Sequence, residues 1–185
     1  VKVEYGSILP ATQAQMRVYT AQLKNPDSTL YNITGAVRTE NIEKTRLINA
    51  VNELVARHES LRTHFKNVDG TIYQIIDENV SAIVDEISDF NDFAKPFDLS
   101  VAPLMRVGYN KNTIAIDIHH VIADGETINI LFNEFNELYM GNELPEAIQY
   151  GEFAVTDGYS EADEKYWIDL FTEEVPELSL PYDFS

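Results

Sequence analysis

The residues best suited to chemistry lie together at positions 118–125, IHHVIADG, which hold two of the four histidines in this 185-residue chain. A neutral imidazole can take a proton from an attacking amine or hydroxyl, or hold that group in line, and it titrates near physiological pH. Asp124 and Gly125 follow the histidines. The segment therefore combines a proton acceptor, a carboxylate, and a glycine that lets the chain bend sharply or lets substrate approach the backbone.

His119 and His120 end an alternating apolar stretch in which Ile114, Ile116 and Ile118 share one face. Because side chains on a strand alternate between its two faces, the two imidazoles are expected to point in opposite directions. We expect one of them in a pocket and the other packed into the scaffold.

Three interpretations of this segment are open. In the catalytic one, a histidine acts on substrate and Asp124 holds the loop through an ion pair with a buried arginine. In the structural one, Asp124 is a helix N-cap, Gly125 is a turn residue, and both histidines are satisfied in the scaffold. A metal site is the least favoured, because the histidines are opposed and no further histidine lies nearby.

The elements that must position these residues follow from periodicity and capping signals. Helices are predicted over 10–23, where Thr12 and Gln15 are spaced as a capping box, and over 41–59, with Asn41 as N-cap. A third helix follows Gly125 and closes at Gly141, so the histidines lie where a strand passes into a helix.

Strands are predicted at four places along the chain. They lie at 30–38, in a hairpin over 61–77 that turns at Asp69-Gly70, at 81–87, and in a hairpin over 103–120 that turns at 110–112. Residues 89–97 are expected to form a turn or short helix, and an acidic helix and a proline-rich extended segment follow position 160. This order predicts an α/β (α+β layered) fold, a mixed β-sheet covered by helices.

Composition narrows the function classes. The chain has 13 Lys and Arg against 31 Asp and Glu, a net charge of −18, which disfavours nucleic acid and membrane surfaces as partners. It has no cysteine, which excludes disulfides and thiolate chemistry. Gly-x-Ser-x-Gly, Walker and Gly-x-Gly-x-x-Gly motifs are absent. No apolar run reaches the length of a membrane span and no signal-peptide pattern is present, so a cytoplasmic protein is expected.

Several motifs occur in a recognisable order: ATQAQMRVY at 11–19, RHESLRTHF at 57–65, IHHVIADG at 118–125, YGEFAVTDGYS at 150–160, and KYWIDLF followed by LSLPYDF. Together they resemble the motifs of the condensation domains of nonribosomal peptide synthetases. The second matches the family pattern Arg-His-Glu-x-Leu-Arg-Thr-x-Phe at every defined position, and the fourth is a looser relative. The resemblance covers essentially the whole chain.

This resemblance implies a chloramphenicol acetyltransferase-like lobe. Residues 1–175 would be the N-terminal lobe of a condensation domain, and 176–185 the start of the crossover to a C-terminal lobe that the chain lacks. Family domains are about twice as long, with the active-site tunnel between the lobes. The lobe alone is therefore expected to be inactive.

The resemblance also implies a reaction and site residues. The amine of an acceptor aminoacyl thioester would attack a donor acyl or peptidyl thioester, with both held on phosphopantetheine arms. His120 would face the substrate channel as general base or positioning group, beside His119, Asp124 and Gly125, and Arg62 would form a structural ion pair with Asp124. The implied partners are donor and acceptor peptidyl carrier proteins, the C-terminal lobe and a neighbouring adenylation domain. No metal or directly bound cofactor is implied.

Some positions depart from the family pattern. Glu126 and Thr127 stand where an aromatic or aliphatic residue and a serine are usual, and Glu152 replaces the aspartate of the fourth motif. The motifs at 11–19 and 57–65 favour condensation over epimerization, and the intact histidines disfavour heterocyclization. An L-configured donor is favoured. Two alternatives are a non-catalytic carrier-binding lobe and a coenzyme A-dependent acyltransferase.

Overall fold

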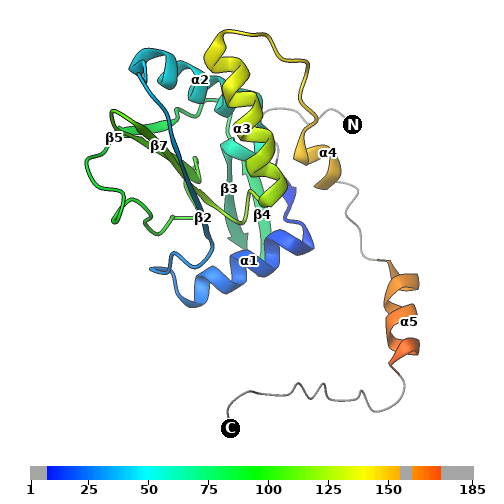
Figure 1. Ribbon diagram of the computed structural model, residues 1–185. Helices are drawn as coiled ribbons and strands as arrows, with labels where there is room; N and C mark the ends of the chain where they lie inside the picture. Colours follow the sequence, from blue (N-terminus) through cyan, green and yellow to red (C-terminus); the bar gives the residue numbers. More distant parts are fainter. Residues whose placement is uncertain (1–7, 155–159, 172–185) are drawn as a thin grey trace, which may run out of the picture.

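The computed structural model describes residues 8–154 and 160–171, and its elements form two sheets against which most of the helices pack (Figure 1). One sheet is antiparallel, with strand order β1-β4-β3; the other has the order β2-β7-β6-β5. The strands are β1 (Ile8–Pro10), β2 (Asn32–Arg38), β3 (Thr63–Val68), β4 (Thr71–Ile76), β5 (Ile83–Glu86), β6 (Met105–Tyr109) and β7 (Thr113–His119). The helices are α1 (Gln13–Lys24), α2 (Lys44–Arg57), η1 (Glu59–Arg62, a 3-10 helix), α3 (Gly125–Met140), α4 (Tyr150–Ala154) and α5 (Glu161–Leu170).

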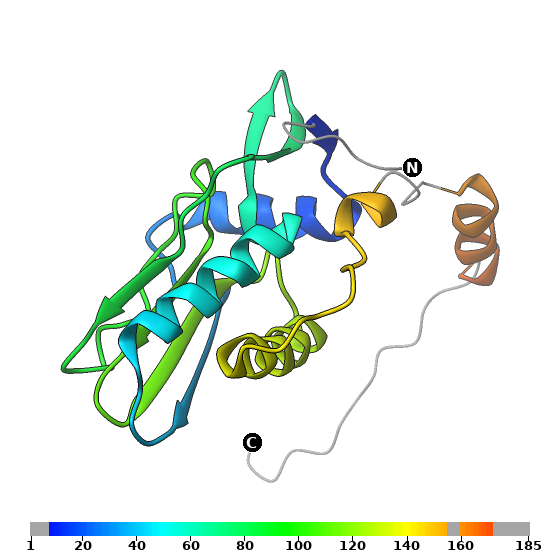
Figure 2. The same cartoon turned by 90° about the horizontal axis from the view of Figure 1, so that it is seen from above.

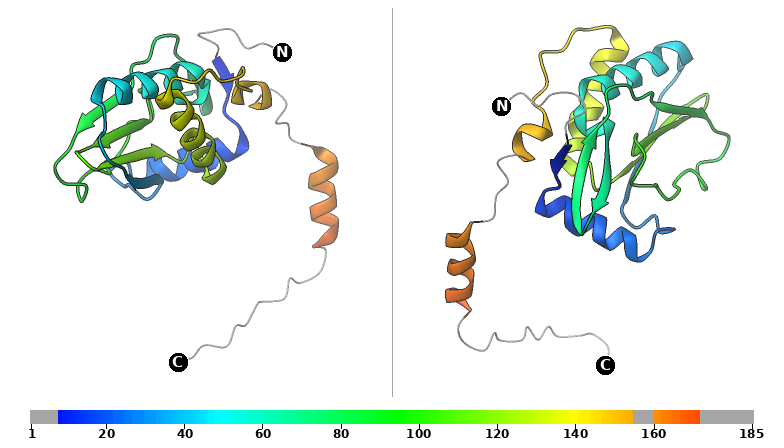
Figure 3. Two further views of the ribbon diagram at one scale, coloured as in Figure 1. Left: turned by 45° about the horizontal axis from the view of Figure 1, so that its top comes forward. Right: turned by 180° about the vertical axis from the view of Figure 1, so that it is seen from behind.

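The predicted mixed sheet is the four-stranded one, in which β5 runs parallel to β6 and the other pairs are antiparallel. The layered α/β prediction is confirmed, but the hairpin of β3 and β4 forms a separate sheet with β1 (Figure 3). Strand β1 was not predicted, because three residues that end in Pro10 are too short to show alternation.

Both predicted hairpins are confirmed. Asp69 and Gly70 have φ angles of 51° and 88°, the pair of left-handed residues that a type I′ turn requires. The second hairpin pairs Met105 with Ile118 and Tyr109 with Ile114, so it turns over residues 110–112. Its register places the end of β7, with His119, beside the start of β6.

The helix ends confirm one cap and correct another. Thr12 and Gln15 form the predicted capping box, since each side chain accepts a hydrogen bond from the backbone N–H of the other. The prediction of Asn41 as N-cap of α2 is wrong. Asn41 adopts a left-handed φ of 57°, and Glu43 caps the helix by accepting from two backbone N–H groups of its first turn.

The later elements match the prediction in part. Gly141, with a φ of 84°, closes α3, and the acidic helix is α5. Residues 89–97 contain turns but no helix, while α4 was not anticipated. The proline-rich segment falls at 172–185, outside the described residues. No helix in the described part of the chain is both long and apolar enough to cross a membrane.

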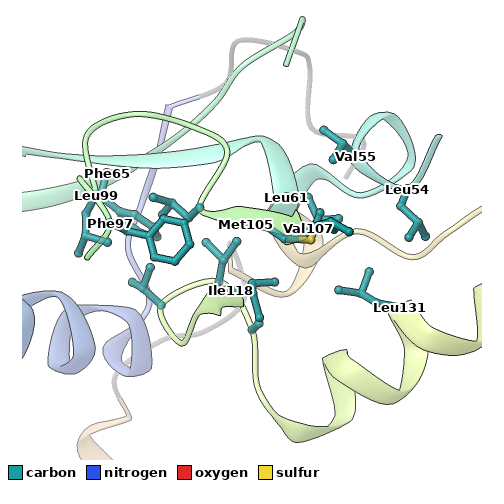
Figure 4. Packing of buried hydrophobic residues seen from close by; sticks show 14 of the residues in the cluster. Leu54, Val55, Leu61, Phe65, Phe97, Leu99, Met105, Val107, Ile118 and Leu131 are labelled. Atoms are coloured by element: carbon teal, nitrogen blue, oxygen red, sulfur yellow. The ribbon is translucent and has the colours of Figure 1, made fainter. Parts of the chain in front are cut away.

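The core lies where α2 and α3, which are neighbours in Figures 1 and 2, pack on the four-stranded sheet. Figure 4 shows Met105, Val107 and Ile118 of that sheet among side chains from the helices and the β3 segment. The figure also labels Leu54 and Val55 of α2, Leu131 of α3, Leu61 of η1 and Phe65 of β3, together with Phe97 and Leu99 from the segment before β6. Each fully buried aliphatic side chain stabilises the fold by about 1.5–3 kcal/mol. This core fixes β7, which carries the histidines.

Helix α1 connects the two sheets. Its buried face carries Gln15, Tyr19 and Gln22, spaced four and three residues apart. Gln15 donates to the Gln74 side chain on β4, and the Gln22 side-chain oxygen lies 3.4 Å from His119 Nε2 on β7. The helix therefore holds the two sheets together next to the histidines (Figure 1).

Candidate functional site

His119 is the buried member of the histidine pair. It is fully shielded from solvent, and its ring lies beside the rings of Tyr31 and Phe97, with centroid separations of 6.4 and 6.1 Å. Its Nδ1 accepts the backbone N–H of Val121 at 3.1 Å. Nε2 must therefore carry the proton that is donated to Gln22 Oε1. Both ring nitrogens are used inside the scaffold.

Burial, together with a smaller contribution from the charge of His120, lowers the pKa of His119 to about 4. The imidazole is therefore neutral at physiological pH, in a single tautomer. A neutral, fully engaged ring with no solvent contact cannot exchange protons with a substrate. His119 thus serves as a fixed part of the scaffold.

His120 lies on the opposite face and is exposed. Its backbone N–H donates to the Tyr31 carbonyl at 2.7 Å, which holds the main chain beyond the end of β7. Its side chain lines a pocket of about 290 Å³. The prediction that one histidine enters a pocket and the other packs into the scaffold is confirmed.

The pocket lies where both sheets, α1 and α3 meet. Besides His120 it is lined by Ala14, Gln15, Val18, Glu59, Ser60, Thr63, Gln74, Ile76, Val121, Ile122, Ala123, Asp124, Thr127, Tyr150 and Gly151. Thr12 and Tyr150 join its two sides through a 2.9 Å contact between their hydroxyl groups. Segments from the first, second, third and fourth motifs therefore meet around one histidine.

Asp124 caps α3, as the structural interpretation predicted. Its Oδ1 accepts from both the backbone N–H and the hydroxyl of Thr127, at 2.9 and 2.8 Å, and the first of these bonds is the main cause that lowers the pKa of Asp124. Thr127 also accepts the Asp124 backbone N–H, which completes a capping box. The departure from the family serine at position 127 thus keeps a hydroxyl that caps the helix.

The ion pair between Arg62 and Asp124 that the resemblance implies is not formed, although both residues lie in the described part of the chain. Arg62 is buried and its Nη1 donates to the carbonyl oxygen of Asp77. Asp124 is exposed, and its carboxylate already accepts hydrogen bonds at the start of α3. The loop is held by this cap.

Gly125 is the first residue of α3, and a Cβ added to it would have no atom within 4 Å. It lacks the positive φ that would demand glycine there. The residue therefore neither makes a sharp left-handed bend nor relieves a crowded contact. Of the two roles predicted for Gly125, the sharp bend is not seen. The space over its backbone is open, which leaves room for a substrate to approach.

A charged network supports the buried side of β7. Asp117, fully buried, accepts hydrogen bonds from the Asn32 side chain at 2.8 Å and the Lys95 backbone at 3.3 Å, and lies 3.5 Å from Arg106 Nε. Burial raises its pKa, while Asn32 and Arg106 oppose that rise. The Arg106 guanidinium stacks 3.9 Å from the Phe97 ring centroid, and that ring meets His119 edge-on. This network helps to fix the position of His119.

A second network ties α2 to α3. Glu134 of α3 accepts two hydrogen bonds from Arg57, at 2.9 and 3.1 Å, and contacts His58 Nε2. The Gln149 side chain then bridges the Arg57 carbonyl and the Glu59 backbone N–H. The segment 57–62 is therefore held against the helix that Asp124 caps.

Two residues around the histidine pair were not predicted from the sequence. Gln22 bonds to His119, and its signal in the sequence was a pair of glutamines, Gln15 and Gln22, spaced seven apart on one face of the predicted helix. Glu59 lines the pocket, and its signal was its place inside the motif at 57–65. Among the described residues, no group of three His, Asp or Glu side chains is placed to hold a metal ion.

Comparison with known proteins agrees with this arrangement. Residues 6–185 match the family model described as the condensation domain. Tyrocidine synthase 3 of Brevibacillus parabrevis is 36% identical over 213 residues, which cover 99% of this chain and 3% of that protein. Gramicidin S synthase 2 of Brevibacillus brevis is 39% identical over 202 residues, covering 95% of this chain and 4% of that protein.

Solved structures show the same fold. The condensation domain from Monacolin K polyketide synthase MokA has a TM-score of 0.74 at 22% identity, covering 94% of this chain and 45% of that one. The starter condensation domain of rhizomide synthetase RzmA has a TM-score of 0.74 at 20% identity, covering 89% and 48%. The chain thus spans about half of these solved domains and a few per cent of the curated relatives.

Proposed function

Since the chain belongs to the condensation-domain family, we propose that it is the N-terminal lobe of a domain that forms an amide bond between two thioesters. The donor is an acyl or peptidyl thioester, and the acceptor is an aminoacyl thioester whose amine attacks the donor carbonyl. The new C–N bond forms as the donor C–S bond breaks, and the donor phosphopantetheine leaves as a free thiol. Residues 1–175 form the lobe, and 176–185 begin the crossover to a C-terminal lobe. The relatives named as synthases of tyrocidine and gramicidin S support this assignment.

The observation that carries the proposal is the different environment of the two histidines at the end of β7. His119 is buried, with both ring nitrogens used in the scaffold, whereas His120 is exposed at a pocket lined by the other motifs. Only His120 of the pair can meet a substrate. An imidazole there can take the proton that the amine loses as the new C–N bond forms, or orient the amine towards the carbonyl.

Positioning supplies much of the acceleration, because a thioester is already an activated acyl group. Holding the two thioesters in line makes their encounter effectively intramolecular. The open approach over Gly125 lets the reacting groups lie next to His120. Asp124 fixes that backbone by capping α3 and acts as a positioning residue.

The partners follow from this chemistry. Both thioesters are carried on phosphopantetheine arms of donor and acceptor peptidyl carrier proteins, and a neighbouring adenylation domain loads the acceptor. A structural neighbour described as a four-domain nonribosomal peptide synthetase supports this multidomain setting. The C-terminal lobe completes the tunnel, so the 185-residue chain alone is inactive in condensation.

The test is single-turnover amide formation from two loaded carrier proteins, using a two-lobe protein with this chain as its N-terminal lobe. His120→Ala is expected to lower the rate at least about tenfold, which corresponds to about 1.4 kcal/mol of transition-state stabilisation. Equal rates would make His120 a scaffold residue. Carrier binding without product would favour a non-catalytic docking lobe, and turnover of free acyl-coenzyme A would favour an acyltransferase.

A further inference from the structure

Glu59 has an unusual position for an acidic residue. It is only 8% exposed, although it is the first residue of η1, and it lines the same pocket as His120. Its backbone is fixed on both sides: its N–H donates to Gln149 at 3.0 Å and its carbonyl accepts from the Thr63 hydroxyl at 2.8 Å. The carboxyl group is therefore presented from a rigid support.

The carboxyl oxygen Oε2 of Glu59 is buried and has no hydrogen-bond partner among the described residues. Leaving such an acceptor unsatisfied is costly, and native proteins rarely do so without a functional reason. The contrast with Asp117 is direct, because that carboxylate, which is fully buried, is satisfied by Asn32, the Lys95 backbone and Arg106. The fold can satisfy a buried carboxylate that serves structure alone.

The electrostatic surroundings of the Glu59 carboxyl group favour the binding of a cation. Burial raises the pKa of Glu59, the positive charge of Arg62 opposes the rise, and the negative charge of Glu152 adds to it. The Arg62 Nη1 atom donates elsewhere, to the Asp77 carbonyl. A ligand that brings a positive charge and N–H donors would supply the missing hydrogen bond and would favour the ionised carboxylate, which burial disfavours.

We propose that Glu59 binds the amino group of the acceptor substrate through its buried carboxyl oxygen, as a second substrate-contacting residue of the His120 pocket. The inference rests on the proposed function, which requires an amine nucleophile in this pocket. An α-amino group is largely protonated below about pH 7.7–8, so it offers charge and three N–H donors to a carboxylate. Glu59 thus selects and orients the amine that His120 acts on.

Calorimetry on the two-lobe protein can distinguish amine binding by Glu59 from a purely structural role. The experiment compares the binding of two small thioesters. Alanyl-pantetheine carries the amino group, and propionyl-pantetheine has a hydrogen in its place. The wild-type protein is expected to bind the alanyl compound at least about tenfold more tightly, as fits one charge-assisted hydrogen bond. Glu59→Gln, which keeps the shape and removes the charge, is expected to abolish this preference.

Two further variants complete the design. Glu53→Gln changes an exposed glutamate on α2 and is expected to retain the preference. Glu59→Leu is expected to unfold at the same or a higher urea concentration than wild type, because it removes an unsatisfied buried group, whereas a structural role predicts a lower one. This measurement also tests the proposal if a variant proves too unstable for calorimetry.

The proposal is overturned if the wild-type protein binds neither thioester, binds both equally, or keeps its preference in Glu59→Gln. Amide formation measured in parallel reports on the proposed function. Amine preference that depends on Glu59, without amide formation, would reject condensation but keep the amine site. Amide formation that depends on His120, without amine preference, would reject only the role of Glu59.

Discussion

At the end of β7, two adjacent histidines lie in contrasting environments, one buried and one exposed. On one side His119 is enclosed by aromatic rings and hydrogen-bonded through both nitrogens. On the other side His120 is exposed, and its backbone N–H is held by the Tyr31 carbonyl. The same side-chain type is thus neutral and inert on one face and available to substrate on the other.

This difference shows that the environment, rather than the residue type, assigns the chemistry. A strand turns consecutive side chains to opposite faces, so one pair of histidines can supply both a structural anchor and a reactive group. On the buried side, His119 and Asp117 are removed from water, which is energetically costly. The hydrogen bond of His119 with Gln22 and the contacts of Asp117 with Asn32, the Lys95 backbone and Arg106 offset this cost. Four predictions test this contrast.

The largest effect is expected from Arg106→Leu on the buried side. The substitution leaves the Asp117 carboxylate enclosed without its counter-ion and should lower the free energy of unfolding by about 3–5 kcal/mol. Urea denaturation measures the change. The double variant with Asp117→Asn should recover part of the loss, and an additive loss would show that the two residues do not interact.

The second prediction concerns pH. Because the pKa of His119 is lowered to about 4 from 6.5, the unfolded chain binds more protons than the folded one between those values. Stability from this residue is therefore present above pH 6.5 and is lost as the pH falls to 4, by about 3 kcal/mol in all. His119→Asn keeps an acceptor for the Val121 N–H but does not titrate. The wild type should lose more stability than this variant across that window, and parallel curves would contradict the prediction.

The third prediction compares the two histidines directly. His119→Ala opens a cavity and leaves Gln22 and the Val121 N–H without their partner, which should cost about 2–3 kcal/mol. His120→Ala, at an exposed position, should change stability by less than about 0.5 kcal/mol. Thermal or urea unfolding of both variants is the measurement. Equal losses would remove the distinction between scaffold and reactive histidine.

The smallest effect is expected at the helix that follows. Asp124→Ala removes the cap of α3 and should lower the free energy of unfolding by about 1 kcal/mol. Asp124→Asn keeps a capping oxygen and should stay close to wild type. If the asparagine variant were as unstable as the alanine variant, the charge of Asp124 would matter more than its hydrogen bond, and an ionic role would need to be reconsidered.

Local patterns predicted much of this fold. Alternation and helical periodicity located both hairpins and the passage from β7 to α3, and alternation alone placed the two histidines on opposite faces. Capping chemistry located the start of α1 and the end of α3. These features depend on interactions within a few residues, which a single sequence displays.

Features that depend on distant neighbours were not predicted. The start of α2 depends on a glutamate that reaches two backbone N–H groups, whereas Asn41, the better capping type, turns left-handed before it. One partner of Arg62 is a carbonyl fifteen residues along the chain, which no motif spacing specifies. Likewise, the place of Glu59 in the pocket depends on how η1 packs beside α4.

The pairing of β6 with β7 has a consequence for how this protein can evolve. Tyr109 pairs with Ile114 at the turn end and Met105 with Ile118 at the other, so residues inserted at 110–112 would leave every pair intact. One residue inserted between 114 and 118 would instead turn the following side chains to the opposite face. The two histidines would then change faces, so that His119 would take the present place of His120 at the pocket. Homologous chains should therefore vary in length at the turn and keep the distance from the strand core to the histidines constant.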